Sequence, residues 1–240
     1  MSFFGISDLH LSFTEPVNPN NWENVKQYKP MNIFSDNWQE HYRQVYENWQ
    51  KTVGPDDIIL MPGDFSWAMK LHDVINDLEF LGLLPGTIIG VQGNHDFWWQ
   101  SISKVRKVLP SNIKLIQNDH VLIGNTAVCG TRGWLCPNDS FFSESDLKIY
   151  RRELIRLENS LKSVKHPVED IIVMMHYMPT NEKHEKSGFI EILEQYKVTT
   201  VIYGHLHAQA CRFRLPDHNW GMDFHLVSAD FVNFTPKYIK

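Results

Sequence analysis

The sequence predicts an α/β fold, because short apolar runs alternate with helical patterns along its 240 residues. The clearest apolar runs are Asp57–Pro62, Thr87–Gln92, Asp170–Met175 and Thr199–Tyr203. Polar side chains follow each of these runs directly, and open α/β sheets bind their ligands beyond the carboxyl ends of the strands. We therefore expect a sheet covered by helices, with a functional site at the strand ends.

Composition and charge favour one globular domain, residues 1–240, with a sizeable core. The chain is 42% hydrophobic with a formal charge of −5, so no basic field favours nucleic acid, which is expected only as a substrate. No apolar run approaches membrane-spanning length, and the first predicted strand starts at Met1, which leaves no room for a signal peptide. The three cysteines are too few for a disulfide framework. We expect a cytoplasmic enzyme.

The N-terminal part of the chain is expected to contain a strand, a long loop and a helix. Met1–Ser7 is the strand, and it ends in Asp8-Leu9-His10. Residues two apart on an extended chain point the same way, so Asp8 and His10 should reach one ligand together. Leu11–Ser35 shows no periodicity and reads as a long ordered loop, a type of segment that is usually functional. The helix that follows has apolar positions at Trp38, Tyr42, Val45, Trp49 and Val53.

The next two strands each end in glycine followed by polar residues. Asp57–Pro62 closes on Gly63-Asp64, and Thr87–Gln92 closes on Gly93-Asn94-His95-Asp96. The latter turn offers an amide oxygen, an imidazole that titrates near neutrality and a carboxylate. Helices are predicted after both motifs, the first with Leu71, Val74, Ile75, Leu78 and Leu81 on one face and the second over Phe97–Leu109.

The second half of the chain continues this alternation and ends with antiparallel strands. The predicted elements are strands at Ile113–Gln117 and His120–Val128 (a hairpin turning at Gly124-Asn125), a helix at Ser145–Val164, the strand Asp170–Met175, a helix at Phe189–Tyr196, the strand Thr199–Tyr203, and strands at Cys211–Leu215 and Asp223–Val227. His176 directly follows one of these strands, and Gly204-His205-Leu206-His207 follows another.

Candidate ligands thus occur at the ends of five predicted strands: Asp8 with His10, Asp64, Asn94 with His95, His176, and His205 with His207. Each set alone is ordinary for a turn or a buried histidine, but their joint occurrence at strand ends is improbable by chance. Carboxylate, imidazole and amide oxygen together suit manganese, iron, zinc or cobalt. The ligands are too many for one ion and about enough for two, which a carboxylate such as Asp64 could bridge.

In chain order, Asp8-Leu9-His10, Gly63-Asp64, Gly93-Asn94-His95-Asp96, His176 and Gly204-His205-Leu206-His207 resemble the five-block signature of calcineurin-like metallophosphoesterases. The resemblance implies a four-layer α/β/β/α sandwich with two central mixed β-sheets and two divalent metal ions at the strand ends. It implies one metal on Asp8, His10 and His207, a second on Asn94, His176 and His205, and Asp64 as the bridge. His95 would be the general acid, and Asp96 would orient its ring.

The resemblance further implies a phosphoester hydrolase that uses a metal-bound hydroxide as nucleophile. Protein phosphatases of this superfamily carry arginines in the second and third blocks, but here those blocks continue as Phe65-Ser66-Trp67 and Phe97-Trp98. A phosphodiesterase or small-molecule phosphatase is therefore favoured over a protein phosphatase. The alternatives are a nuclease and a catalytically silent scaffold that binds protein partners. Such scaffolds usually lose ligands, whereas every block here is intact.

Arg132, in Gly130-Thr131-Arg132-Gly133-Trp134, is the remaining candidate for a contact with substrate phosphate. It follows a strand and lies among glycines that permit close approach. A surface arginine or a structural ion pair explains it equally well. Lys183, His184 and Lys186 form a smaller basic cluster with the same two interpretations.

Overall fold

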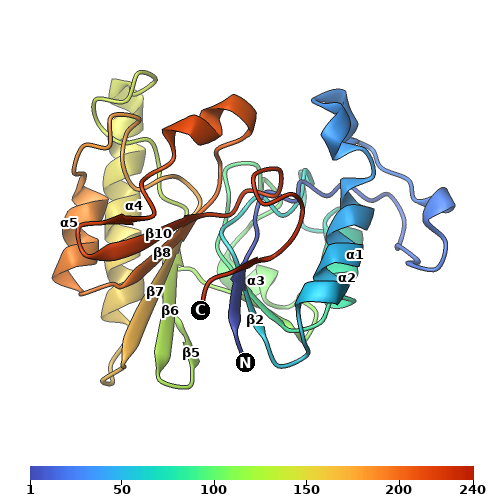
Figure 1. Cartoon of the computed structure of the whole chain (residues 1–240), viewed down its shortest axis with the longest axis horizontal. Helices are drawn as coiled ribbons and strands as arrows, with labels where there is room; N and C mark the ends of the chain where they lie inside the picture. Colours follow the sequence, from blue (N-terminus) through green and yellow to red (C-terminus); the bar gives the residue numbers. More distant parts are fainter.

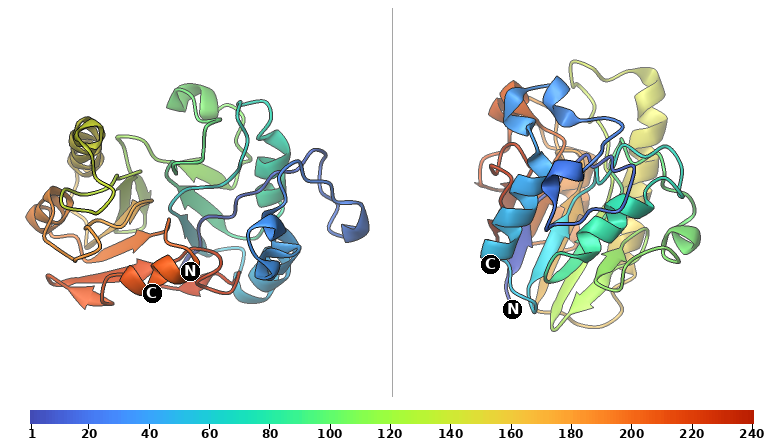
Figure 2. Two further views of the ribbon diagram at one scale, coloured as in Figure 1. Left: turned by 90° about the horizontal axis from the view of Figure 1, so that it is seen from above. Right: turned by 90° about the vertical axis from the view of Figure 1, so that its right-hand side faces the viewer.

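A computed structural model describes residues 1–240 and shows two β-sheets between two layers of helices. The strand order is β11-β1-β2-β3-β4 in the first sheet and β5-β6-β7-β8-β10-β9 in the second. Figures 1 and 2 show α1 and α2 on the side of the molecule opposite α4 and α5. The predicted four-layer sandwich with two mixed sheets is therefore confirmed.

The first sheet consists of strands from the N-terminal half of the chain and one strand from its end. Its members are β1 (Phe3–Gly5), β2 (Ile58–Met61), β3 (Thr87–Gly90), β4 (Ile113–Leu115) and β11 (Lys237–Tyr238). The first four pair in parallel, and β11 pairs antiparallel with β1. β1 and β2 are buried along their whole length, as expected for parallel strands covered on both faces.

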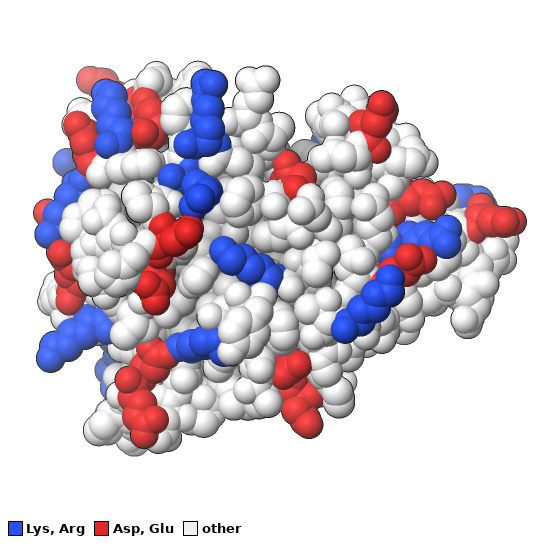
Figure 3. All heavy atoms as spheres, viewed as in Figure 1, with Lys and Arg blue, Asp and Glu red and all other residues white.

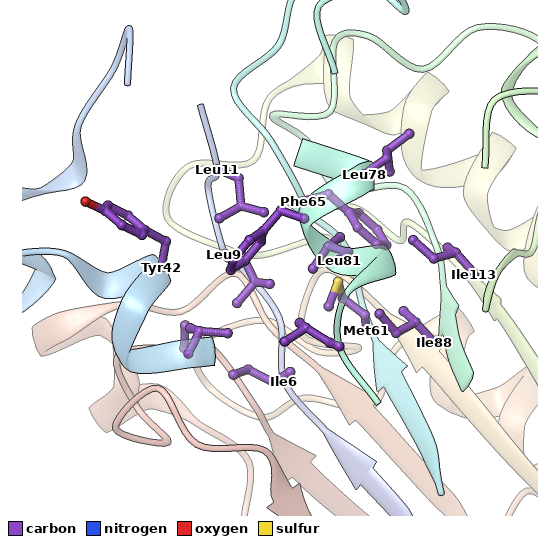
Figure 4. Packing of buried hydrophobic residues seen from close by; sticks show 14 of the residues in the cluster. Ile6, Leu9, Leu11, Tyr42, Met61, Phe65, Leu78, Leu81, Ile88 and Ile113 are labelled. Carbon is purple, nitrogen blue, oxygen red and sulfur yellow. The ribbon is translucent and has the colours of Figure 1, made fainter. Parts of the chain in front are cut away.

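Three helices, α1 (His41–Thr52), α2 (Ile75–Gly82) and α3 (Ile102–Val105), belong to this half of the molecule. Figure 4 shows Leu81 of α2 packed toward Met61 of β2 and Ile88 of β3. The fully buried Trp49 of α1 joins the same core, and its indole Nε1 donates to the Pro85 carbonyl at 2.9 Å. Of the predicted apolar stripes, Tyr42, Val45 and Trp49 are buried in α1 and Leu78 and Leu81 in α2. The remaining positions Trp38, Val53, Leu71 and Val74 lie outside the two helices, which are shorter than the stripes predict.

The second sheet contains β5 (Val121–Ile123), β6 (Thr126–Thr131), β7 (Asp170–Met175), β8 (Thr200–Tyr203), β9 (His218–Asn219) and β10 (Met222–Leu226). Its outer face is covered by α4 (Glu144–Lys162) and α5 (Gly188–Gln195). Ser143 and Asp146 form a capping box at the start of α4, and Ser187 caps α5 by accepting two backbone N–H bonds. None of the helices has the length and apolar character needed to cross a bilayer.

Two predicted elements differ from the structure. The helix predicted over Phe97–Leu109 is only the single turn α3, because the chain first makes a tight turn in which the Trp98 indole and the Trp99 amide both bond back to Asp96. The strand predicted at Cys211–Leu215 is instead part of a 3-10 helix, Ala208–Phe213. Apolar alternation over five residues is too short to exclude a three-residue period. The strand β10 consequently pairs with β9 and, in parallel, with β8.

The two sheets meet beside the carboxyl end of β1. Ser7 N donates to the Val227 carbonyl at 2.8 Å, and Ala229 N donates to the Ser7 carbonyl at 2.9 Å. These bonds form an isolated parallel bridge between Ser7 and Ser228. Since Asp8 is the next residue, this bridge fixes the first predicted ligand relative to both sheets.

Candidate metal centre

All seven predicted metal ligands lie at one edge of the paired sheets, beyond the carboxyl ends of five strands. The first sheet supplies Asp8 and His10 after β1, Asp64 after β2 and Asn94 after β3. The second sheet supplies His176 after β7, and His205 and His207 after β8. The candidate site is therefore built between two sheets rather than along the edge of one.

Asp8, His10 and His207 form the first group, and each offers a ligand atom within 4.8 Å of those of the others. His207 Nε2 lies 3.3 Å from Asp8 Oδ1. Asp8 and His10 are buried, and the Ser7 hydroxyl donates to the second oxygen of Asp8. This group combines one carboxylate with two imidazoles, which is a donor set suited to a borderline divalent cation.

Asn94, His176 and His205 form the second group. Asn94 Oδ1 lies 2.5 Å from His176 Nε2 and 3.0 Å from His205 Nδ1, and the two ring nitrogens are 3.2 Å apart. Three atoms that can each donate a lone pair thus converge on one point. Asp8, Asp64 and His176 also place ligand atoms within 4.8 Å of one another, which joins this group to the first.

Asp64 lies between the two groups. Its Oδ2 is 3.7 Å from His10 Nε2 on one side and 3.5 Å from His176 Nε2 on the other. Its Oδ1 accepts the backbone N–H of His95 at 2.8 Å. One oxygen of a buried carboxylate therefore faces both groups, while the other oxygen fixes the start of the His95 turn.

The backbone at these residues is left-handed rather than extended. Asp8 has φ 59° and His10 has φ 47°, so the extended geometry expected for this pair is wrong even though both side chains reach the same group. Asp64 and His205 also have positive φ, 53° and 68°. Each such residue costs on the order of 1 kcal/mol, a strain that typically accumulates at functional sites. The tight turns are what direct successive polar side chains into one small volume.

Two glycines allow these turns to approach each other. A Cβ on Gly93 would lie 2.0 Å from Asp64 Oδ1, and a Cβ on Gly204 would lie 2.3 Å from Asp8 Oδ2 and from Ser7 Oγ. Both distances are far below van der Waals contact. The glycines that precede Asn94 and His205 are therefore required because a ligand carboxylate occupies the space that a side chain would fill.

Burial keeps most of the histidines neutral. It lowers the pKa of His176 to about 4 and that of His205 to about 3, and it lowers the pKa of His10 well below its ordinary value. Burial raises the pKa of Asp64, and the neighbouring carboxylates of Asp96 and Asp8 raise it further. Neutral imidazoles beside mutually repelling carboxylates are the arrangement that a divalent cation stabilises. The donor set therefore fits metal ions.

Outer partners orient two of the histidine rings. His176 Nδ1 lies 2.9 Å from the Pro62 carbonyl, and His207 Nδ1 lies 2.8 Å from Asp230 Oδ1. Such contacts fix which ring nitrogen faces a metal. Asp230, which also accepts the Ala208 N–H, is a site residue that sequence reasoning missed. Like the predicted ligands, Asp230 follows a strand, in this case β10. It lies beyond Ser228 and Ala229, so it is not among the polar residues that directly follow a strand.

His95 stands beside the first group with its ring held by aromatic neighbours. The ring is half-buried, 4.5 Å from the Trp67 ring and 5.5 Å from the His10 ring by centroids, with Phe97 6.0 Å away. No protein hydrogen bond occupies its ring nitrogens. Burial lowers the pKa of His95, and the charge of Lys29 lowers it further.

Asp96 does not orient the His95 ring, which corrects the expectation from sequence. Its buried carboxylate accepts five N–H groups: those of Gly93 at 2.7 Å, Phe65 at 2.9 Å, Asp64 at 3.0 Å, Trp98 Nε1 at 3.0 Å and Ser66 at 3.3 Å. Three of these donors belong to the neighbouring turn after β2. Burial raises the pKa of Asp96 to about 6, although these donors oppose the shift. Asp96 thus ties the turn that holds Asp64 to the turn that holds Asn94.

Arg132 forms an ion pair with a carboxylate of the helix that covers the second sheet. Its guanidinium lies 3.6 Å from the carboxylate of Glu153 on α4, which is itself fully buried. Arg156 Nη1 and Thr131 Oγ1 bond to the same carboxylate at 2.8 and 2.7 Å. The Arg132 carbonyl accepts the N–H of His176 at 3.0 Å. These contacts agree with the structural interpretation of Arg132, and its backbone positions a candidate ligand.

The smaller basic cluster also has local partners. Lys186 pairs with Glu194 at 2.5 Å, and Lys183 Nζ donates to the Asn138 carbonyl at 3.2 Å. His184 Nε2 lies 2.9 Å from the Phe213 carbonyl. The structural interpretation accounts for all three residues.

Comparison with known proteins agrees with this arrangement. The sequence matches the calcineurin-like phosphoesterase family over residues 1–209. A phosphopantetheinyl hydrolase of Mycobacterium tuberculosis is similar in structure, with 13% identity, a TM-score of 0.51 and coverage of 95% of this chain and 88% of that one. A protein of unknown function from Aquifex aeolicus has 15% identity and a TM-score of 0.49, with coverage of 99% and 95%. No curated protein matches the sequence significantly.

A third similar structure is GAP50, the anchor in the inner membrane complex of Plasmodium, with 14% identity, a TM-score of 0.48 and coverage of 96% of this chain and 72% of that one. At 13% identity the phosphopantetheinyl hydrolase shows a similarity of fold alone. The two-sheet sandwich with its cluster of aspartates and histidines agrees with the class that the family match gives, a metal-dependent phosphoesterase. The match over residues 1–209 shows that the chain belongs to the calcineurin-like phosphoesterase family.

Proposed function

We propose that the protein hydrolyses phosphodiesters or small phosphate esters at a centre of two divalent metal ions. Asp8, His10 and His207 would hold one ion, and Asn94, His176 and His205 would hold the other. The observation that carries this proposal is the position of Asp64, whose Oδ2 is 3.7 Å from His10 and 3.5 Å from His176. A carboxylate oxygen between two ligand groups is suited to bridging two ions.

When bound, the metal ions would neutralise charge on the phosphate oxygens and lower the pKa of a water molecule for attack. The chain itself provides the proton for the leaving group, which we assign to His95. Its ring adjoins the first group and makes no competing hydrogen bond, so a ring N–H is free to reach the departing oxygen. An anionic phosphate nearby raises the pKa of His95 and so offsets the effects of burial and Lys29.

The side chains around His95 bear on the class of phosphate ester. Phe65, after the second motif, is a buried core residue, and the third motif is followed by the exposed Phe97 and the buried Trp98. Arg132 is paired with Glu153. No arginine fork is therefore directed at a phosphate, which disfavours recognition of a dianionic phosphomonoester. A diester carries less charge and needs less neutralisation. This argument supports phosphodiesters as the preferred substrates.

A nuclease is less well supported than a small-molecule enzyme. Figure 3 shows acidic and basic side chains interspersed on the face it displays, without a continuous basic surface. The formal charge of −5 offers no general attraction for a polyanion. A small phosphate ester, in contrast, requires only the charges at the metal centre.

The proposal is tested by measuring the metal content of the purified protein and its activity with added manganese on bis-p-nitrophenyl phosphate and p-nitrophenyl phosphate. We expect about two equivalents of metal and faster hydrolysis of the diester. Hydrolysis of neither compound by the protein with two metals bound would contradict the proposal. A single equivalent of metal would contradict the dinuclear assignment alone.

A further inference from the structure

The Leu11–Ser35 loop places one lysine at the edge of the proposed active site. Lys29 Nζ lies 3.1 Å from the centroid of the Trp67 ring. The Trp67 ring is 4.5 Å from the His95 ring, and it stacks on the ring of His10 at 4.5 Å. Lys29 and the residue that we assign as general acid therefore contact the same indole ring.

Lys29 has no anionic partner within the protein. Burial is the sole cause of its lowered pKa, with no contribution from a carboxylate, and its ammonium packs on an aromatic face instead. Lys26, in the same loop, differs because it pairs with Glu15 at 3.0 Å. An ammonium that is close to a catalytic group and lacks a counter-ion is available to an anionic ligand.

The loop holds this lysine in a defined position. The Ser12 hydroxyl donates to the Lys29 carbonyl at 2.9 Å, and Tyr28 N donates to the Ser12 carbonyl at 3.0 Å. On the other side, Met31 is buried and its Sδ accepts the Trp67 indole N–H at 3.2 Å. The backbone on both sides of Lys29 is therefore anchored to the fold, and the cation is preorganised rather than recruited from a free loop.

We propose that Lys29 binds an anionic group on the leaving-group side of the scissile bond, so that the enzyme prefers pyrophosphate diesters over diesters whose leaving group carries no phosphate. In such a reaction water adds across the P–O–P bond: its oxygen bonds to one phosphorus, the bridging oxygen leaves with the other, and the proton from His95 goes to that oxygen. Two phosphate monoesters are released. This inference rests on the proposed function, because His95 marks the leaving-group side.

The test compares two substrates that differ in the leaving group, di-(p-nitrophenyl) pyrophosphate and bis-p-nitrophenyl phosphate, with products separated by chromatography. Lys29→Met keeps an unbranched side chain and removes the charge over Trp67. We expect kcat/KM for the pyrophosphate to fall about 10- to 100-fold, the effect of one charged hydrogen bond. For the diester, the factor by which kcat/KM falls should be at least about ten-fold smaller. Lys29→Arg, which keeps a positive charge, should retain most of the wild-type activity on the pyrophosphate.

Lys26→Met is the matched control, since it removes a lysine of the same loop that is already paired with Glu15. It should leave both activities unchanged, and the thermal unfolding of all variants should coincide. Equal losses on both substrates in Lys29→Met, no loss on either, or a wild-type enzyme that cleaves only the diester would each overturn the inference. If the metal-loaded wild type cleaves neither substrate, the proposed function itself fails.

Discussion

Aromatic rings rather than a carboxylate hold the ring of His95, and this affects how its role is tested. Trp67 and Phe97 limit the ring position, while both ring nitrogens stay free of protein partners. A residue held in this way can be removed without disturbing a hydrogen-bond network. Loss of His95 should therefore report on proton transfer and not on the assembly of the metal centre.

We predict that His95→Ala lowers kcat by about 100- to 10,000-fold, the usual contribution of a general acid, with unchanged metal content. The loss should be larger for phenyl and methyl leaving groups than for p-nitrophenyl, because poor leaving groups need the proton most. Rates over this series and metal analysis provide the measurement, with the exposed His72→Ala as control. A parallel loss of bound metal would make His95 a ligand instead.

Asp96 differs from His95 because its function in the structure is to join two turns. Replacing it by Asn converts one carboxylate oxygen into an N–H donor, which then faces backbone donors that include Gly93 N and Asp64 N. We predict that Asp96→Asn lowers the free energy of unfolding by about 2–5 kcal/mol, since two buried N–H groups lose their acceptor.

Metal affinity should fall in Asp96→Asn as well, because Asp64 belongs to one of the two turns. Urea unfolding of the metal-free protein and metal analysis test both statements. A variant with normal stability and metal content but a reduced kcat would instead show that Asp96 orients His95.

At the scale of elements, α2 is attached to the base of the N-terminal loop through a buried acid. Asp77 is fully buried, its Oδ1 accepts the Phe13 N–H at 2.8 Å, and the Ser66 hydroxyl bonds to its other oxygen. Burial raises the pKa of Asp77 from 3.8 to about 7, against the opposing effect of these two hydrogen bonds. The folded state therefore binds this proton more tightly than the unfolded state does.

The sign of the resulting pH dependence follows from linkage. The contribution of Asp77 to stability is full below about pH 3.8 and is lost as pH rises through about 7. Asp77→Asn keeps an acceptor for the Phe13 N–H and donates to the Ser66 hydroxyl. We predict that its free energy of unfolding, relative to that of the wild type, increases between about pH 3.8 and 7 by up to about 1.4 kcal/mol per pH unit.

Urea unfolding between about pH 4 and 8, with chelator present, measures this difference for Asp77→Asn. Glu79→Gln, an exposed substitution on the same helix, is the control and should follow the wild type. Parallel profiles for Asp77→Asn and the wild type would show that Asp77 stays ionised in the folded protein.

The strands and most of the site could be predicted because both depend on local sequence. Buried parallel strands such as β2 and β7 are continuous apolar runs, and each candidate ligand follows a strand within a few residues. Contacts between turns could not be predicted in this way. Three of the five donors to Asp96 lie about 30 positions earlier in the chain and become neighbours only because β2 and β3 pair.

The positive φ angles were missed for a related reason. The spacing of Asp8 and His10 predicts that they continue the strand, whereas the chain leaves β1 at Gly5 and turns. Likewise, the apolar spacing after Asp96 fits a helix, but the bonds from Trp98 and Trp99 back to Asp96 are stronger local determinants. Side-chain hydrogen bonds to turns are not visible in a periodicity.

For the molecule as a whole, the candidate centre joins two sheets that are otherwise connected by side-chain packing and by the bridge at Ser7. Because both sheets supply ligands, bound metal would crosslink the two halves of the fold. A metal bound only by the folded state stabilises it by about 2.7 kcal/mol at a concentration 100 times its Kd. Metal removal should therefore lower the stability of the whole sandwich and not only that of one loop.

We predict that chelation lowers the melting temperature, that manganese restores it, and that the effect grows as pH rises. Burial alone would lower the pKa of His207, but Asp8 and Asp230 outweigh it and raise the pKa to about 10 in the metal-free protein. A metal must then displace this proton, so its apparent affinity increases with pH. His207→Ala should abolish most of the metal-dependent shift, whereas the exposed His218→Ala should not. Calorimetry with and without manganese at several pH values decides this, and equal melting temperatures in both conditions would show that no metal couples the two sheets.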